Sequence, residues 1–450
     1  MKADLAIYCK QTVLPDGIKE VTLLITEGKI VEIQEGKAPA GSAAKSVTCG
    51  ESVLMPGLID SHVHINEPGR TEWEGFETAT KAAAAGGVTT LVDMPLNSTP
   101  VTTTLANFKA KLKAAEGKIY VNCGFWGGIV PGNAKDIDAL IDAGVLGFKA
   151  FLTHSGIEDF PNASIKDIET IADKLVRKDL PLLVHAEFDE KSEAQEEHVR
   201  EPYSYQAFLK SRPKEWEDKA IAAMIKVAEK FRLRTHIVHL SSSNSIAPIQ
   251  DAKQKGIPIS VETCPHYLFF NAETIPDADP RFKCTPPIRE KDNNEQLWSA
   301  LVDGTIDFVV TDHSPAPPEM KSITDGNLKE AWGGISTLQF ELPIVWTMAM
   351  GKDVTLEQIS AWLSTNIAKF LNLPAKGKIE VGADADLVVW NPVKKMKVSP
   401  ALMRFRHPIS PYEGTMLSGL VEKTYVGGVL VYDKGSFVSS PTGKIILKNS

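Results

Sequence analysis

The sequence predicts an α/β fold: a (β/α)8 barrel of the TIM type with a smaller β-sandwich domain formed by both chain ends. Two observations support this fold class. From about residue 55, short apolar runs rich in Val, Ile and Leu alternate with longer segments of helical periodicity. Before and after that region, the apolar runs alternate with polar residues and are separated by turn residues.

The barrel prediction depends on the number of apolar runs. Helix-like stretches such as TEWEGFETATKAAAAGG, SIKDIETIADKLVRK and EDKAIAAMIKVAEKF separate many of them, and further helical segments occupy about 335–350 and 355–371. Eight strand-helix units are typical of a closed parallel barrel. The eight runs are LMPGLIDSHVHI, VTTLVDMP, YVNCGFWGG, VLGFKAF, PLLVHAE, RTHIVHLSS, PISVETCPHYL and IDFVVTDHSP.

The β-domain is predicted from alternation at both ends of the chain. The runs ADLAIYC and VTLLITEGKIVEI near the start are followed, after the barrel, by KGKIEVGADADLVVWNP and VEKTYVGGVLVYDKGSF. We therefore expect residues 1–53 to form the first part of a β-sandwich and residues 54–375 to form the barrel. Residues 376–450 complete the sandwich and end in a surface tail.

Composition excludes several classes of partner. The formal charge is −8, and no basic stripe suited to nucleic acid or to a membrane surface is present. Five widely spaced cysteines indicate reduced thiols rather than a disulfide framework. No long apolar segment resembles a signal peptide or a membrane span, so we expect a cytoplasmic protein.

Polar residues at the ends of the apolar runs predict a metal centre. His62 and His64 are two residues apart at the end of a strand-like run, so both imidazoles project to the same side and can bind one metal ion. The active sites of such barrels lie at the C-terminal ends of the strands. Further potential ligands end later runs: Lys149, His185, His239 and Asp312.

The number of these groups favours two metal ions. Four imidazoles and two oxygen ligands exceed the needs of one tetrahedral ion, and paired ions lie about 3.5–4 Å apart. Lys149 stands in an apolar strand, where desolvation and nearby cations lower its pKa. A neutral lysine reacts with carbon dioxide to give a carbamate, whose two oxygens provide one ligand for each metal.

The predicted chemistry is metal-assisted hydrolysis of an amide-like C–N bond. A hydroxide that bridges two metals is a nucleophile near neutral pH, and one metal polarises the substrate carbonyl. Asp312, as ligand and catalytic residue, accepts the proton of the hydroxide and passes it to the leaving nitrogen. Zinc is the default metal, although iron, cobalt and manganese suit the same ligands.

Each ligand also has an ordinary structural alternative. The stem of Lys149 can pack at a strand end while its amine reaches solvent. His185 and His239 can be hydrogen-bonded core histidines, and Asp312 can cap a turn. His236, three residues before His239, is expected to face the other way and is excluded from the site.

The motifs HVH, GFKAF, VHAE, VHLSS and TDHSP, in this order, resemble the cyclic-amide branch of the amidohydrolase superfamily over residues 1–445. This branch includes dihydropyrimidinases, hydantoinases, dihydroorotases and allantoinases. The stretches HVHINEPGRTEWEGFETATKAAAAGGVTT, DMPLNSTP, ETCPHY, KCTPPIR, DHSPAPPEMK and AWGGISTLQ look most like allantoinases. The resemblance implies that the enzyme opens the hydantoin ring of allantoin to give allantoate, in purine degradation, and is a homotetramer. It assigns the metal pair to His62, His64, carbamylated Lys149, His185, His239 and Asp312.

The resemblance also suggests residues on the substrate side. Dihydroorotases carry an arginine at the position of Asn66, where it binds a carboxylate that allantoin lacks. Hydantoinases place a tyrosine five residues after the metal-binding lysine, where this chain has His154, a candidate to stabilise the oxyanion. Asn97 and the backbone of Thr285 are further candidates for substrate contacts.

Two alternatives to allantoin hydrolysis remain open at this point. A hydantoinase or dihydropyrimidinase shares the same metal ligands and differs in the loops around His154 and AWGGI. A non-catalytic scaffold is known among relatives that have lost metal ligands, and the complete set of potential ligands here argues against it.

Overall fold

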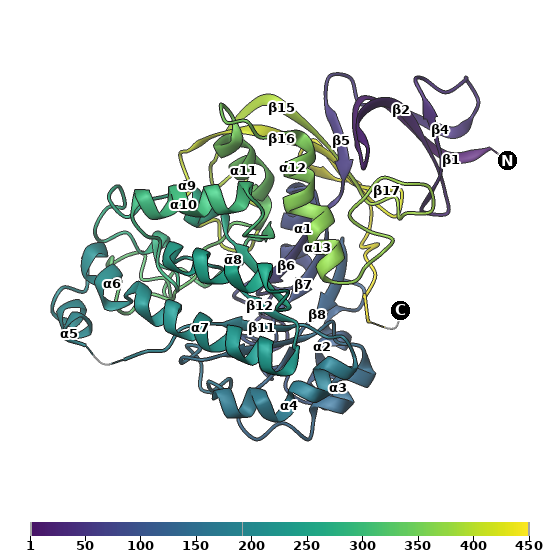
Figure 1. Ribbon diagram of the computed structural model, residues 1–450. Helices are drawn as coiled ribbons and strands as arrows, with labels where there is room; N and C mark the ends of the chain where they lie inside the picture. Colours follow the sequence, from purple (N-terminus) through teal and green to yellow (C-terminus); the bar gives the residue numbers. More distant parts are fainter. Residues whose placement is uncertain (1, 191, 449–450) are drawn as a thin grey trace.

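A computed structural model of the chain describes residues 2–190 and 192–448 and has the predicted barrel (Figure 1). Every strand pairing within the barrel is parallel, and a bridge between Val63 and His313 joins the first strand to the segment after the last one. The third position is shared by two short strands, so the eight predicted runs provide eight positions in the barrel. The strands are β6 (Leu58–Val63), β7 (Val88–Asp93), β8 (Asn122–Phe125) with β9 (Gly127–Gly128), β10 (Phe148–Phe151), β11 (Leu182–His185), β12 (Thr235–Ile237), β13 (Ile259–Thr263) and β14 (Phe308–Val309).

Amphipathic helices surround these strands. In α4 (Ile165–Arg177), Ser164 and Asp167 form a capping box, and the side chains at helical spacing from Ile168 to Leu175 are buried. The other long helices are α1 (Phe76–Ala85), α2 (Leu105–Ala115), α3 (Ile137–Ala143), α7 (Lys214–Phe231), α8 (Ile246–Gln254) and α10 (Lys291–Val302).

Shorter helices lie in the loops and at the end of the barrel. Both helical segments predicted after the eighth strand are present, and the second one contains a π-helical turn between two short α-helices. These elements are α5 (Glu193–Arg200), α6 (Tyr205–Ser211), η1 (Ser243–Ser245), α9 (Pro265–Phe269), η2 (Pro280–Phe282), η3 (Leu338–Phe340), α11 (Glu341–Ala349), α12 (Leu356–Ser360), η4 (Ala361–Thr365) and α13 (Asn366–Phe370).

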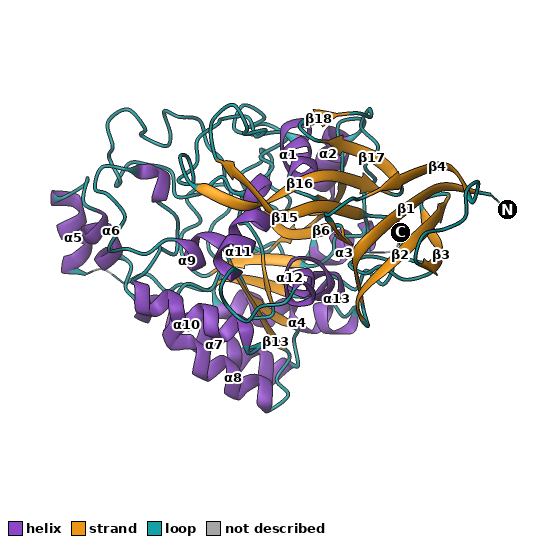
Figure 2. Ribbon diagram, turned by 90° about the horizontal axis from the view of Figure 1, so that it is seen from above, coloured by secondary structure: helices purple, strands orange, loops and turns teal. Residues whose placement is uncertain are grey.

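The β-domain combines strands from both chain ends, as expected, in a single nine-stranded sheet (Figure 2). Its centre is β5 (Val53–Pro56), which pairs with β1 from the N-terminal part and with β15 from the C-terminal part. The remaining strands are β1 (Ala3–Leu14), β2 (Gly17–Thr26), β3 (Lys29–Glu35), β4 (Ala43–Thr48), β15 (Leu387–Lys397), β16 (Met416–Val426), β17 (Val429–Asp433) and β18 (Ser436–Phe437).

One predicted run serves two sheets. The sequence LMPGLIDSHVHI was expected to be a single barrel strand, but Gly57 divides it, and β5 belongs to the β-domain while β6 belongs to the barrel. At Gly57 a Cβ atom would lie 2.3 Å from the side chain of Thr89, so only glycine fits where the chain passes between the two sheets.

Strand β15 shows how the two parts pack together. Val388 and Trp390 point into the large core that fills the barrel region, whereas Leu387 and Val389 point into a second core inside the β-domain. This alternation is the period of two that a strand imposes, and it buries both faces of β15. Among the described residues, no helix has both the length and the apolar character needed to cross a bilayer.

Replacement of Gly147 by alanine is expected to destabilise the strand that carries Lys149. A Cβ atom at Gly147 would lie 2.6 Å from the carbonyl oxygen of Pro181 and 2.7 Å from the ring of Trp126, so the backbone of β10 must shift. We expect a loss of about 1–3 kcal/mol in the free energy of unfolding, measured by denaturant titration. An unchanged unfolding midpoint would contradict this account of the packing.

Candidate metal centre

His62, His64 and Asp312 meet where the barrel closes. Their potential ligand atoms all lie within 4.8 Å of one another, and all three residues are buried. Asp312 Oδ1 is 3.2 Å from His62 Nε2 and 3.4 Å from His64 Nε2. His62 lies in β6, His64 follows it, and Asp312 follows β14, so strands far apart in the sequence provide one cluster.

His185 and His239 complete the wall of the same cavity. The ring centroids of His185 and His239 are 4.6 Å apart, and those of His62 and His239 are 5.4 Å apart. A narrow cavity of about 40 Å³ is lined by five of the six predicted ligands: His62, His64, His185, His239 and Asp312.

Lys149 is fully buried beside this group, on β10. Its ammonium nitrogen has no hydrogen-bond partner among the described residues and lies 4.9 Å from the centroid of the Phe151 ring. Burial lowers the pKa of Lys149 to about 7. The alternative in which its amine reaches solvent is therefore wrong.

The environment of His62, His185 and His239 keeps these three imidazoles neutral. Burial, and then the charge of Lys149 and neighbouring histidines, holds the pKa of His62 and of His239 well below the usual range. Burial also lowers the pKa of His185. Neutral imidazole is the form that binds a metal ion, so the donor set fits divalent metal ions.

Buried carboxylates orient these histidines, and the sequence analysis did not identify them. Glu262 Oε1 is 2.5 Å from His62 Nδ1, and Glu187 Oε2 is 2.6 Å from His185 Nε2. Each contact leaves the other ring nitrogen available for a metal, an arrangement common in metal-binding histidines. Glu187 was within reach of sequence reasoning because it follows His185 by two residues in VHAE.

His236 lies outside the cavity, as predicted, but not because it faces away. Its Nε2 is 3.0 Å from Glu262 Oε2, and its Nδ1 is 2.8 Å from the hydroxyl of Ser260. Glu262 therefore links His236 to His62, and His236 supports the metal centre indirectly.

Of the four candidate substrate contacts, two line the narrow cavity and two do not. Asn97 and Thr285 line the narrow cavity, and the side-chain amide of Asn97 is 3.2 Å from His64 Nδ1. Asn66 is buried, and its amide nitrogen donates to the carbonyl of Pro315 at 3.3 Å. His154 lines only a larger outer cavity, and its side chain is 55% exposed, 3.4 Å from Glu158.

Four residues of the candidate site have an unusual backbone conformation. Asn66, Asn97, His239 and Asp312 have φ values of 66°, 67°, 39° and 44°, in the left-handed region that favours glycine. For His239 and Asp312 this conformation immediately follows the barrel strands and turns each side chain toward the cavity. Strain of this kind persists where the surrounding structure enforces it, and it is typical of functional sites.

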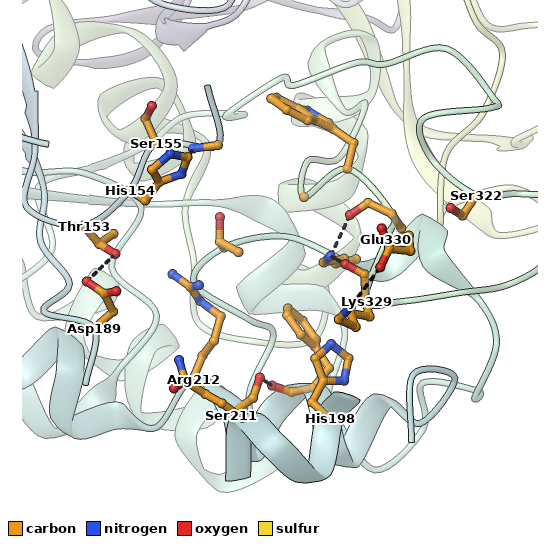
Figure 3. A pocket seen from close by; sticks show the side chains of 18 of the residues that line it. Thr153, His154, Ser155, Asp189, His198, Ser211, Arg212, Ser322, Lys329 and Glu330 are labelled. Atoms are coloured by element: carbon orange, nitrogen blue, oxygen red, sulfur yellow. Dashed lines mark hydrogen bonds and ion pairs between the residues drawn. The ribbon is translucent and has the colours of Figure 1, made fainter. Parts of the chain in front are cut away.

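The narrow cavity opens into an outer chamber of about 690 Å³ (Figure 3). Arg212 points into this chamber, where its Nη2 donates to Glu187 Oε2 at 2.5 Å. Burial alone would raise the pKa of Glu187, but Arg212 and His185 outweigh burial and lower it to about 2. Arg212, which the sequence analysis did not identify, thus keeps the carboxylate beside His185 ionised.

Comparisons with known proteins agree with this geometry. The amidohydrolase family model matches residues 53–431. The chain is 47% identical to an allantoinase of Arabidopsis thaliana, over 98% of this chain and 90% of the relative. It is 44% identical to an allantoinase of Streptomyces avermitilis, over 98% of both proteins.

Solved structures give the same fold over the whole chain. L-Hydantoinase (dihydropyrimidinase) from Arthrobacter aurescens aligns with a TM-score of 0.93 and 29% identity, over 99% of this chain and 100% of that one. Dihydropyrimidinase from Brevibacillus agri aligns with a TM-score of 0.89 and 26% identity, over 99% and 98%. The chain therefore belongs to the amidohydrolase family and, within it, to the branch that contains the allantoinases.

Proposed function

We propose that this protein hydrolyses the cyclic amide of allantoin and releases allantoate. The observation that carries the proposal is the convergence of His62, His64, His185, His239 and Asp312 on one buried cavity, with Lys149 beside it. The similarity to allantoinases selects the substrate within the range of cyclic amides.

These six residues are proposed to hold two divalent metal ions, with zinc as the default. Bound metals supply a nucleophile at neutral pH by lowering the pKa of water, and they polarise the substrate carbonyl. Lys149 Nζ is proposed to form a carbamate, in which an N–C bond to carbon dioxide forms and one proton leaves. Its burial and lack of a hydrogen-bond partner among the described residues support this role.

Asp312 is the proposed proton carrier. Its Oδ1 faces His62 and His64 at the floor of the cavity, where it can accept a proton from the attacking water. Cleavage of the ring C–N bond then requires a proton on the leaving nitrogen, and Asp312 is placed to return it. Asp312 is held in a left-handed backbone conformation of the kind that is typical of functional sites.

The substrate-side residues remain part of the proposal in modified form. Asn97 is better placed to orient His64 than to bind substrate, because its amide contacts the ring nitrogen of that histidine. Thr285 lines both cavities and is retained as a substrate contact. The cytoplasmic location and the homotetramer stay predictions.

Substrate profiling is the first test of this function. Allantoin, hydantoin, dihydrouracil and dihydroorotate are offered to protein purified with bicarbonate and a divalent metal, and ring opening is measured. We expect allantoin to be the preferred substrate and EDTA treatment to abolish its turnover. Preference for hydantoin or dihydrouracil would support the hydantoinase or dihydropyrimidinase alternative, and full activity after metal removal would exclude the metal mechanism.

Replacement of ligands tests the site itself. Asp312→Asn is expected to lower kcat by about two to four orders of magnitude because the proton carrier is lost. His62→Ala is expected to abolish turnover through loss of metal. Both variants should remain folded, as measured by circular dichroism. His407 lies outside both cavities, so His407→Ala serves as the control. Near-normal activity in either purified site variant would refute the mechanism.

The carbamate on Lys149 makes a separate prediction. Protein stripped of metal and depleted of carbon dioxide should regain activity with metal only when bicarbonate is added. With ¹³C-labelled bicarbonate, we expect one carbamate resonance in the NMR spectrum, and none in Lys149→Met. Full recovery without bicarbonate, or an unchanged signal in that variant, would rule the modification out.

A further inference from the structure

Lys321 joins three parts of the chain that surround the entrance to the metal centre. Its ammonium donates hydrogen bonds to the main-chain carbonyls of Lys283, Trp332 and Gly334, at 2.8, 2.9 and 2.5 Å. The residue is only 5% exposed. These three bonds use all three donors of an ammonium group, and each goes to a backbone carbonyl.

A buried charge held by carbonyls places a strong demand on the surrounding structure. Removing an ammonium from water is costly unless its hydrogen bonds are replaced with good geometry. Here carbonyls of two segments, 283–285 and 332–334, take the place of water as acceptors, so the segments must lie close together around the ammonium. If Lys321 is replaced, the carbonyls of Trp332 and Gly334 lose this donor, whereas that of Lys283 keeps the N–H of Gly334, so the lysine and the two segments stabilise one another.

The two segments form half of the opening between the cavities. Six residues line both the narrow cavity and the outer chamber, and we call them the aperture. One further hydrogen bond joins the segments: the Gly334 N–H donates to the Lys283 carbonyl at 2.9 Å. The aperture consists of Phe151, Ser155, His185, Thr285, Trp332 and Gly333.

Lys321 is therefore connected to the aperture without lining either cavity. Its acceptors are the carbonyls of Trp332, Gly334 and Lys283. Trp332 belongs to the aperture itself, Gly334 follows Gly333, and Lys283 lies two residues before Thr285. The N–H of Trp332 also donates to the carbonyl of Met320, the neighbour of Lys321, at 2.7 Å. A change at Lys321 therefore acts directly on Trp332 and on the neighbours of Gly333 and Thr285, whereas Phe151, Ser155 and His185 are not among its hydrogen-bond partners.

We propose that Lys321 is a positioning residue that sets the width of the aperture and so determines which cyclic amides bind productively. The proposal rests on the proposed function for the identity of the preferred substrate. Allantoin consists of a hydantoin ring with a ureido arm. With the ring at the metal centre, the arm extends through the aperture toward the outer chamber, so its fit depends on the position of Trp332 and Gly333.

The test compares Lys321→Met with a matched buried lysine. Lys376 is also mostly buried, but it pairs with Asp384 and Asp386 before strand β15 and lines neither cavity. Lys376→Met therefore reports the effect of losing a buried ammonium on stability alone. For each variant we would measure metal content, thermal stability, kcat and KM for allantoin, and the inhibition constant of hydantoin, which has the ring without the arm.

For Lys321→Met we expect the KM of allantoin to rise about tenfold, the scale produced by loss of hydrogen bonds from a charged group. The inhibition constant of hydantoin should change less than threefold, and metal content should equal that of the parent. Lys321→Arg, which restores a charged donor, should recover part of the KM. Lys376→Met should lower thermal stability and leave the KM unchanged.

Two results would overturn the proposal. The first is a folded Lys321→Met protein with lower stability but the parental KM for allantoin, as in Lys376→Met. The second is loss of metal together with an equal change for allantoin and hydantoin, which would place the effect at the metal centre. If the methionine variant does not fold, Lys321→Gln is used instead: its shorter side chain has two donors in place of three, so the KM of allantoin should still rise, and a parental KM refutes the role.

Failure of the proposed function is distinguishable from failure of this inference. If the parent protein does not open allantoin, the same variants are compared on whichever two cyclic amides of different size it does hydrolyse. A size-dependent change in KM in Lys321→Met then supports the positioning role whatever the preferred substrate is. If neither substrate has a different KM in the variant than in the parent, the inference is overturned.

Discussion

Closure of the barrel between its first and last strands is the constraint on which the site depends. The N–H of His64 donates to the carbonyl of His313 at 2.9 Å, and the N–H of Thr311 reaches the carboxylate of Asp60 at 3.4 Å. Asp60 also accepts the N–H of His62 at 3.0 Å. Because these contacts join strands about 250 residues apart in sequence, the proposed metal ligands His62, His64 and Asp312 meet only when the barrel has closed.

The charges beneath the cavity favour a cation at its centre. Burial raises the pKa of Asp60 to about 7 and holds that of Glu262 well above the usual range. A buried carboxylate is costly to ionise without a cationic partner, and a divalent ion at the proposed site would provide that partner. The contacts of Glu262 with His62 and of Glu187 with His185 fix which ring nitrogen of each histidine is left for a metal.

Sequence reasoning predicted the barrel and the residues that gather at the cavity because both follow short-range rules. Strand ends are visible as apolar runs, and polar residues at those ends stand out, which is how Lys149, His185 and His239 were identified. Glu262 was missed because it lies within a run, and its inward direction depends on pairing with strands distant in sequence. The position of His154 could not be decided for a similar reason: the sequence allowed both a substrate contact and an exposed loop residue, and loop conformation depends on contacts that spacing does not encode.

Strands carry the proposed metal ligands and loops form most of the aperture, which explains how one kind of metal centre can act on different cyclic amides. The ligands are fixed by parallel strands that are buried on all sides, so they tolerate little movement. The aperture is instead formed largely by loops, where substitutions and changes in length cost less. Such loops are selective only if they hold one conformation, and that requires buried polar contacts of the kind Lys321 provides. On the proposals made here, the reaction chemistry is a property of the barrel, whereas selectivity is a property of the loop segments that form the aperture.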